Sequence, residues 1–175
     1  MPSTSRGGGK AKKLLRLSRK KKAARLEIGW REWVGLPGLC DRRILAKIDT
    51  GAKTSAIHVH RLRELTLDGR PHVEFYIHPV QKQRRPEFHC LAPVHARRVI
   101  KSSNGIGQER IVILARLTLG EREREIELSL ANRDDMGFRL LLGRDALGKN
   151  VVIHPSRSYM LGRNNLLERS ANRAR

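Results

Sequence analysis

The stretch LAKIDTGAKTS, residues 45–55, decides the fold of this chain. Residues 44–48 alternate between apolar and small or polar side chains, a pattern typical of a half-buried β-strand. This strand runs directly into Asp49, which is followed by the small hydroxyl residue Thr50 and by Gly51. Glycine allows a backbone to turn tightly and to approach a neighbour closely. The stretch therefore predicts an acidic side chain on a tight loop at the end of a strand, with the Thr50 hydroxyl bonding the loop back to nearby backbone.

A second segment of matching type, FRLLLGRDAL, occupies residues 138–147. Its leucines predict a short buried strand over residues 140–142, and Gly143 and Arg144 follow at once. Residues 143–148 predict one or two helical turns closed by a glycine. An apolar strand that ends in glycine can pass beside the acid-bearing loop, with the helix packed behind it.

The rest of the pattern predicts an all-β fold. The alternation of Ile126, Leu128 and Leu130 with polar residues is typical of a half-buried strand. The dipeptide Asp68-Gly69 favours the left-handed positions of a hairpin turn. Several short strands with regular turns indicate a closed barrel or a sandwich. We expect strands over residues 28–36, 44–48, 65–67, 73–77, 94–100, 110–119, 123–130, 140–142, 151–153 and 158–161, and a polar loop over residues 79–86.

Length and charge predict one folded domain between two polar tails. The 175 residues carry a formal net charge of +20, from 37 basic and 17 acidic side chains. Ten of the basic residues and no acidic residue fall within the first 26 positions. We therefore expect a disordered basic arm over residues 1–25, the domain over residues 26–162, and a polar tail over residues 163–175. The arm is either a solvated tail or, through residues 6–25, a contact for ribosome or nucleic acid.

The apolar runs are short. A secretion signal needs about 7–15 apolar residues and a membrane span about 20, and no run in the chain approaches either length. We therefore expect a cytoplasmic protein without membrane contact. In that compartment Cys40 and Cys90 are expected to be reduced thiols. A nucleophilic role for Cys40, which the pattern places in a loop, is the weaker interpretation.

The motifs together resemble the retropepsin-like aspartic endopeptidase family that is often labelled "ATP-dependent zinc protease" and is associated with ribosomal modification. The resemblance covers most of residues 28–161, and its motifs are IGWRE at 28–32, IDTGAKTSA at 48–56, SSNG at 102–105 and LLGR at 141–144. It implies a closed-barrel subunit of the acid-protease fold, with one short helix after the LLGR segment and Asp49 as the catalytic acid. Thr50, Gly51, Ala52 and Thr54 then support the active-site loop, and Gly143 and Arg144 pack against it.

The implied chemistry needs more than one aspartate. Hydrolysis by this route uses two carboxylates about 3 Å apart that share one proton, and only Asp49 lies in an Asp-Thr/Ser-Gly loop. A twofold homodimer, in which Asp49 meets its symmetry mate and Thr50 braces the two loops, supplies the second acid. The peptide substrate is expected to be an acidic or glutamylated tail, because related proteins are linked to a ligase that adds glutamates to a ribosomal protein and because the chain is strongly basic.

Two features depart from the viral-type pattern. Lys53 stands where those enzymes have an acid that pairs with the arginine after the late glycine, so Arg144 needs another partner, such as Asp145 or a carboxylate elsewhere. The segment between Gly51 and Leu140 is also long for a minimal subunit. It offers two candidate flaps, the loop over residues 102–108 and the turn over residues 67–70.

The sequence predicts no cofactor and no metal. The seven histidines form no His-Glu-x-x-His motif, and no Cys-x-x-Cys pair or phosphate-binding Gly-x-x-x-x-Gly-Lys-Ser/Thr loop occurs. His58 and His60 share one face of an expected strand, for which a structural role is favoured. Two rival functions remain beside the aspartic-type hydrolase: a non-catalytic module tethered to ribosome or RNA by the basic arm, and a zinc peptidase that a chelator would inhibit.

Overall fold

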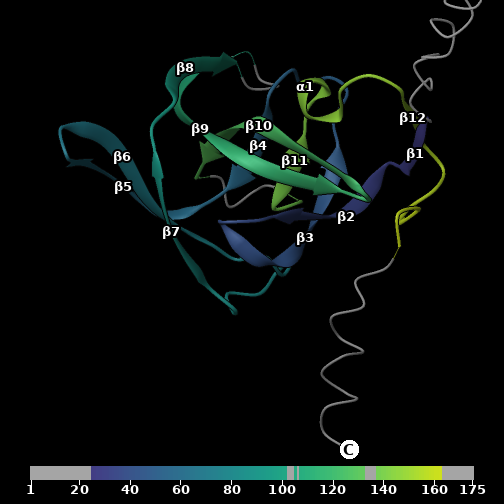
Figure 1. The fold of residues 1–175 in the computed structure, drawn as a ribbon, viewed down its shortest axis with the longest axis horizontal. Coiled ribbons are helices and arrows are strands. Elements are labelled where there is room, and N and C mark those ends of the chain that lie inside the picture. Colours follow the sequence, from purple (N-terminus) through teal and green to yellow (C-terminus); the bar gives the residue numbers. More distant parts are fainter. Residues whose placement is uncertain (1–24, 102–104, 106, 133–136, 163–175) are drawn as a thin grey trace, which may run out of the picture.

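The strand that runs into Asp49 lies inside a sheet in which the order of paired strands forms a closed ring. The structure is a computed structural model that describes residues 25–101, 105, 107–132 and 137–162, and these are nearly all β, with one short helix (Figure 1). The elements are β1 (Leu26–Gly29), β2 (Arg31–Leu36), β3 (Cys40–Ile48), β4 (Ser55–His58), β5 (His60–Leu67), β6 (Arg70–Ile77), β7 (Phe88–Pro93), β8 (Ala96–Lys101), β9 (Gly107–Leu119), β10 (Arg122–Ala131), β11 (Leu140–Leu142), α1 (Arg144–Leu147) and β12 (Val151–His154).

The largest sheet is ring-like. Its strands follow the order β10-β4-β11-β3-β2-β9-β8, and β10 also pairs with β9, so that the ladder returns to its start. The closing contact between β2 and β9 is the single pair Gly35 and Thr118. The ring agrees with the all-β prediction, and β8 extends it as the outer strand of a hairpin with β9.

The core is aliphatic, as the scarcity of aromatic residues predicts. Ile44, Ile57, Ile113 and Leu128 are fully buried within one cluster, and Phe75 is its only aromatic member among the described residues. Burial of such side chains contributes about 1.5–3 kcal/mol each, which makes this cluster the main source of stability. The ring therefore rests on packed Ile, Leu and Val side chains from strands that are distant in sequence.

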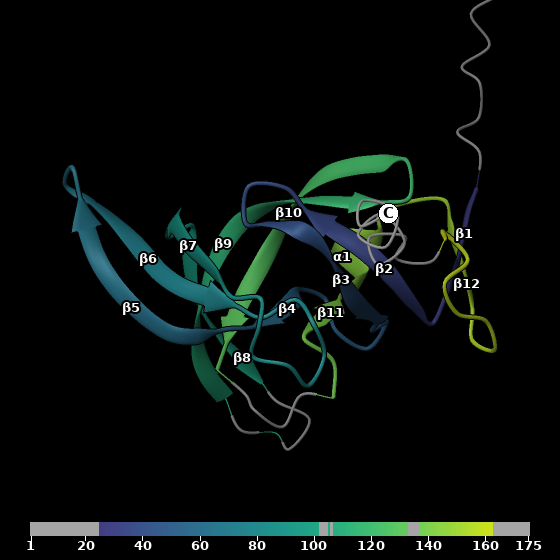
Figure 2. The same ribbon diagram turned by 90° about the horizontal axis from the view of Figure 1, so that it is seen from below.

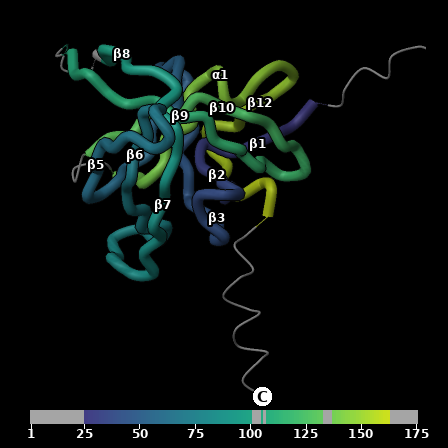
Figure 3. Tube along the Cα trace, turned by 60° about the vertical axis from the view of Figure 1, so that its left-hand side comes forward, coloured from purple at the N-terminus to yellow at the C-terminus, as the bar shows by residue number. Residues whose placement is uncertain are grey.

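A three-stranded sheet, β5-β6-β7, projects from the ring (Figures 1 and 3). The hairpin predicted at Asp68 and Gly69 is confirmed, because both residues take left-handed backbone angles (φ 48° and 72°) and join β5 to β6. Strand β7, which follows the polar loop over residues 79–86, is absent from the predicted strands.

On the opposite side of the molecule, β1 and β12 form a small parallel sheet (Figure 2). The strand predicted over residues 28–36 is interrupted at Trp30, where β1 ends and β2 begins. The strand predicted over residues 158–161 was wrong, because the N–H groups of Met160 and Leu161 donate to the carboxylate of Glu32 at 2.8 and 3.2 Å instead of joining a ladder. Glu32 is completely buried, and the Gly29 N–H also donates to it.

Within the described ranges, no helix is long and apolar enough to cross a membrane. The proposed arm over residues 1–25 and the tail over residues 163–175 lie outside the described residues, apart from Arg25.

Candidate active site

Strand β3 delivers Asp49 to the edge of the ring. The Asp49 N–H donates to the Leu142 carbonyl oxygen at 2.9 Å, and β11 runs parallel to β3 with Leu142 opposite Ile48. The two segments that the sequence expected to meet, residues 45–55 and 138–147, are therefore hydrogen-bonded neighbours. Ladder hydrogen bonds on the last residue before the loop fix the direction in which the chain leaves the strand.

The loop after β3 is held by the aspartate itself. The half-buried Asp49 accepts the Gly51 N–H on Oδ1 at 3.1 Å, and its carbonyl oxygen accepts the Ala52 N–H at 3.3 Å. An aspartate that bonds backbone two residues ahead is a recurrent way of closing a tight turn. Thr50 is exposed at the tip of the loop. Its carbonyl oxygen accepts a hydrogen bond from the Arg144 side chain, which helps to hold the loop in place. The brace by its hydroxyl across a symmetry axis stays a prediction.

The LLGR segment clasps the loop from behind. Backbone N–H groups of Arg144 and Asp145 donate to the carbonyl oxygens of Ala52 and Lys53 at 3.0 and 3.1 Å. A side chain at Gly143 would lie 2.5 Å from the Lys53 carbonyl oxygen, so only glycine permits this approach.

The Arg144 guanidinium donates to the carbonyl oxygens of Thr50 and of Gly51, the latter at 3.1 Å. The sequence predicted a carboxylate as the partner of Arg144, but in the structure the Arg144 side chain bonds backbone carbonyl oxygens. Both bonds come from Nη1, which carries two N–H donors and can therefore serve two carbonyl oxygens at once.

Sequence reasoning assigned no role to Ser55, which is almost completely buried. Its hydroxyl oxygen accepts the Gly143 N–H at 3.1 Å, and its carbonyl oxygen accepts the Ser129 hydroxyl at 2.9 Å. Ser55 therefore links β4, β10 and the LLGR segment. The available signal was a small hydroxyl residue directly after Thr54 of the loop motif.

A cleft of about 1100 Å³ opens beside the loop. Asp49 lines it together with Gly51, Ala52 and Thr54, whereas Thr50, Gly143 and Arg144 act from outside it. The charged residues on its walls are three acids and three bases: Asp49, Glu127, Asp145, Lys53, Arg98 and Arg110. The cleft thus places one carboxylate on a rigid loop within reach of a bound molecule.

The β8–β9 hairpin forms the other wall of the cleft. Arg98, Val99 and Ile100 of β8 line it, and β8 lies on the same upper edge as α1 in Figures 1 and 3. The turn over residues 67–70 contributes no lining residue. The first candidate flap, the loop over residues 102–108, follows β8 in the chain, and its residues 102–104 and 106 lie outside the described ranges. The flap stays a prediction.

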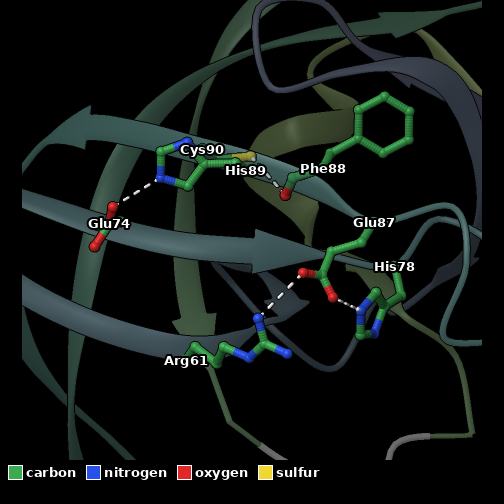
Figure 4. A network of polar contacts seen from close by, with 7 residues as sticks. All are labelled: Arg61, Glu74, His78, Glu87, Phe88, His89 and Cys90. Carbon is green, nitrogen blue, oxygen red and sulfur yellow. Dashed lines mark hydrogen bonds and ion pairs between the residues drawn. The ribbon is translucent and has the colours of Figure 1, made fainter.

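Histidine contacts cluster on the β4–β7 side. His58 and His60 bring their Nε2 atoms to 2.9 Å, and His78 bonds Glu87 at 3.0 Å (Figure 4). The hydrogen bond from His78, aided by the charge of Arg61, lowers the pKa of Glu87. Across the described ranges, no group of three or more His, Cys, Asp or Glu side chains is arranged to hold a metal ion.

The thiols have the properties of core residues. Cys40 is the first residue of β3 and is buried, so its predicted loop position was wrong. Burial raises the pKa of the Cys90 thiol to about 12, and its sulfur donates to the Leu39 carbonyl oxygen at 3.2 Å. Burial also raises the pKa of the Cys40 thiol above its usual value. Because the thiolate is the nucleophilic form, this shift opposes the nucleophilic interpretation of Cys40.

An aspartate loop clasped by a Leu-Gly-Arg segment in a small β structure agrees with the retropepsin-like class that the motifs resemble. Residues 27–164 match the model of the RimB-like family, described as retropepsin-like aspartic endopeptidase RimB, and the chain belongs to this family. The resemblance inferred from the sequence is therefore confirmed.

Known relatives extend this comparison. The chain is 43% identical over 141 residues to proteins of Shewanella pealeana and Shewanella halifaxensis, and 42% identical over 135 residues to one of Desulfotalea psychrophila, each named "Probable alpha-L-glutamate ligase". These matches cover 77–81% of this chain but only 29–31% of the relatives, so the chain spans about a third of their length. A crystal structure of Lpg0085 from Legionella pneumophila, a protein of unknown function, is similar with a TM-score of 0.62 and 26% identity, covering 78% of this chain and 98% of that one.

Proposed function

We propose that this protein is an aspartic endopeptidase that works as a homodimer, with Asp49 of each subunit forming the catalytic dyad. The observation that carries the proposal is the position of Asp49, half-buried on a clasped loop in the wall of the cleft. The family description supports the same class of reaction. A rigid loop matters because catalytic groups must stay close to their productive geometry.

In the proposed reaction the two carboxylates share one proton. The ionised carboxylate accepts a proton from water while the water oxygen attacks the peptide carbonyl carbon, and the protonated carboxyl group donates its proton to the carbonyl oxygen. The tetrahedral intermediate then loses the C–N bond as a proton passes to the leaving nitrogen. Because like charges at about 3 Å cannot both remain ionised, the pair titrates as one coupled unit.

Exposure of the loop tip supports the dimer. Thr50 and Gly51 are exposed in the single chain, and Asp49 is only half-buried, so a second copy can approach the loop. The backbone bonds that hold the loop come from Arg144 and Leu142 of the same chain. Each subunit therefore shapes its own loop, and the partner supplies the second carboxylate.

Acidic or glutamylated tails are the proposed substrates. The formal net charge of +20 attracts polyanions over a distance of several ångströms. The relatives named for glutamate ligation contain a region similar to this chain within a longer polypeptide. A domain joined to such a ligase is suited to act on the glutamate chains that a ligase makes. Equal cleavage of oligoglutamate and uncharged peptides at low salt would contradict this substrate class.

Replacement of Asp49 with Asn tests the proposal. Loss of the acid–base pair should reduce peptide hydrolysis by about 10²–10⁴-fold or more. Asp68→Asn is the matched control, because Asp68 lies at an exposed left-handed turn position that Asn tolerates. Hydrolysis that survives in Asp49→Asn, or a mass in solution that stays monomeric at high concentration, would refute the dyad. A chelator should leave the rate unchanged.

A further inference from the structure

Arg98 and Glu127 form an ion pair inside the proposed active-site cleft. Arg98 lies on β8 and Glu127 on β10, and β9 pairs with both strands between them. Both guanidinium Nη groups of Arg98 donate, one to each carboxylate oxygen of Glu127, the Nη2–Oε1 bond at 2.5 Å. A planar guanidinium fork on two carboxylate oxygens is the geometry with which arginine recognises any carboxylate.

The pair is accessible to solvent and to a ligand. The Arg98 side chain is 42% exposed and the Glu127 side chain 31%. Exposed ion pairs bind weakly because water solvates both charges, so the Arg98 guanidinium can exchange one carboxylate for another at small cost. Glu127 has a second polar neighbour, His95, whose Nε2 lies 3.4 Å from its Oε1. Glu127 therefore retains a neighbour when Arg98 turns to another acid.

The charges on the walls of the cleft explain why an exchange of Glu127 for a substrate carboxylate at Arg98 would matter. These walls carry three acids and three bases, so the cleft has no formal excess of positive charge although the whole chain has one. An acidic side chain that enters must therefore compete with the acids already there. Of the bases, Arg110 is 7% exposed and Lys53 offers a point charge, whereas Arg98 is both accessible and shaped for a carboxylate.

We propose that Arg98 selects an acidic side chain of the substrate, and that Glu127 occupies Arg98 as an internal stand-in for that side chain until substrate binds. This inference rests on the proposed function for its substrate class. It assigns the two residues opposite effects: Arg98 increases affinity for acidic peptides and Glu127 decreases it. Neither effect should extend to uncharged peptides.

A second ion pair, between Arg97 of β8 and Glu64 of β5, provides the controls. Arg97 donates to both carboxylate oxygens of Glu64, one at 2.9 Å, but neither residue lines the cleft. Arg97→Gln and Glu64→Gln therefore repeat the chemical changes of Arg98→Gln and Glu127→Gln at a site away from the substrate. They have the same effect on the net charge of the whole chain, so they also remove the contribution of long-range attraction.

The test measures binding without hydrolysis. The full chain with Asp49→Asn is titrated by calorimetry with tetraglutamate and with tetraglutamine, alone and with each of the four further substitutions. Loss of one charge-assisted fork should weaken tetraglutamate binding about tenfold or more in Arg98→Gln. Glu127→Gln should strengthen it several-fold, and the two control substitutions should change it by less than about twofold, as expected for exposed pairs. Tetraglutamine binding should not change.

The outcomes separate this inference from the proposed function. Equal weakening by Arg98→Gln and Arg97→Gln, or weaker binding in Glu127→Gln with an unchanged melting temperature, would overturn the role of the pair. If Glu127→Gln lowers the melting temperature, Arg98→Lys decides: a loss of tetraglutamate affinity with the charge retained supports fork recognition, and full affinity refutes it. Selective binding without hydrolysis by the unsubstituted chain would refute the peptidase and leave the binding assignment intact.

Discussion

Replacement of Gly143 with alanine should separate the LLGR segment from the aspartate loop. The backbone angles at Gly143 (φ −75°, ψ 171°) are open to any residue, so the cost of the substitution is steric and not conformational. The added Cβ would lie 2.5 Å from the Lys53 carbonyl oxygen, which is 0.9 Å short of the 3.4 Å at which ordinary contact begins. Its next neighbours, Thr54 C and Lys53 C at 2.7 and 2.8 Å, are also backbone and cannot rotate away.

The expected loss of stability follows from the hydrogen bonds that break when the LLGR segment moves by 0.9 Å. The N–H groups of Arg144 and Asp145 donate to the loop over 3.0 and 3.1 Å, and moving the segment by the missing distance stretches these contacts to about 4 Å, beyond hydrogen-bond range. Overpacking costs about 1–3 kcal/mol and each lost hydrogen bond about 1 kcal/mol, so we expect a destabilisation of at least about 3 kcal/mol. At roughly 4 °C per kcal/mol, the melting temperature should fall by about 12 °C.

Thermal unfolding followed by circular dichroism measures this change, and Gly137→Ala is the matched control. A Cβ at Gly137 meets nothing within 4 Å, and its φ is not positive, so that substitution should leave the melting temperature nearly unchanged. Peptide hydrolysis should fall in Gly143→Ala even at temperatures where the chain is folded, because the loop that carries Asp49 loses its clasp. A melting temperature within about 2 °C of the unsubstituted chain would refute the steric reasoning.

Three further predictions follow from individual contacts. Ser55→Ala should reduce the free energy of unfolding in urea by about 1–3 kcal/mol, because the buried Gly143 N–H loses its acceptor; an unchanged midpoint would contradict the bond. Cys90 should resist a disulfide reagent at pH 8 until the chain unfolds, because burial raises its thiol pKa to about 12, and rapid labelling of the native protein would show the thiol to be accessible. The hydrogen bond from Arg98 lowers the pKa of Glu127 below its usual value of 4.5. The pair therefore stabilises the fold above pH 4.5, and this stabilisation is lost as the pH falls through the native pKa of Glu127. In acid unfolding curves, Glu127→Gln should lack the loss of stability that this protonation causes in the unsubstituted chain.

The sequence predicted the elements whose signals are local. The strand into Asp49 and the Asp68-Gly69 hairpin each carry their own pattern within a few residues, and both occur in the structure. The meeting of residues 45–55 with residues 138–147 is a long-range contact, and Gly143 is the motif glycine that lies directly against backbone of the other segment, at Lys53 and Thr54. The resemblance to a known family then paired the two.

Strand β7 was missed because its alternation is inverted. Leu91, the most hydrophobic residue of its middle, is 49% exposed, whereas Cys90 and Ala92 are buried. Hydrophobic periodicity identifies a strand only when apolar residues face inward, and here small residues do so against β6. At residues 158–161 the error was a strand predicted where none exists. The apolar residues there match a strand pattern, but the backbone N–H of Met160 donates to the carboxylate of Glu32, about 128 positions away.

The charged pairs of the cleft could not be predicted for a related reason. Arg98 and Glu127 stand 29 positions apart, and they meet only because β9 pairs with β8 along one part of its length and with β10 along another. A basic residue and an acidic residue on separate strands give no local signal of contact, since most such residues lie on solvated faces. The same holds for Ser55, whose role depends on a glycine 88 positions away.

Lys53 connects the departure from the viral-type pattern with the proposed substrate. An acid at this position would compete for Arg144, but the lysine leaves the guanidinium to the carbonyl oxygens of Thr50 and Gly51. The loop is therefore clasped without a second carboxylate, and the side chain at position 53 is exposed on the cleft wall beside Asp49. Lysine in place of an acid thus removes a negative charge from the aspartate loop and adds a positive charge on the wall of the cleft, where the proposed acidic peptide would lie. A cleft adapted to acidic tails would require this exchange, because each acid on its walls repels the substrate that the net charge attracts.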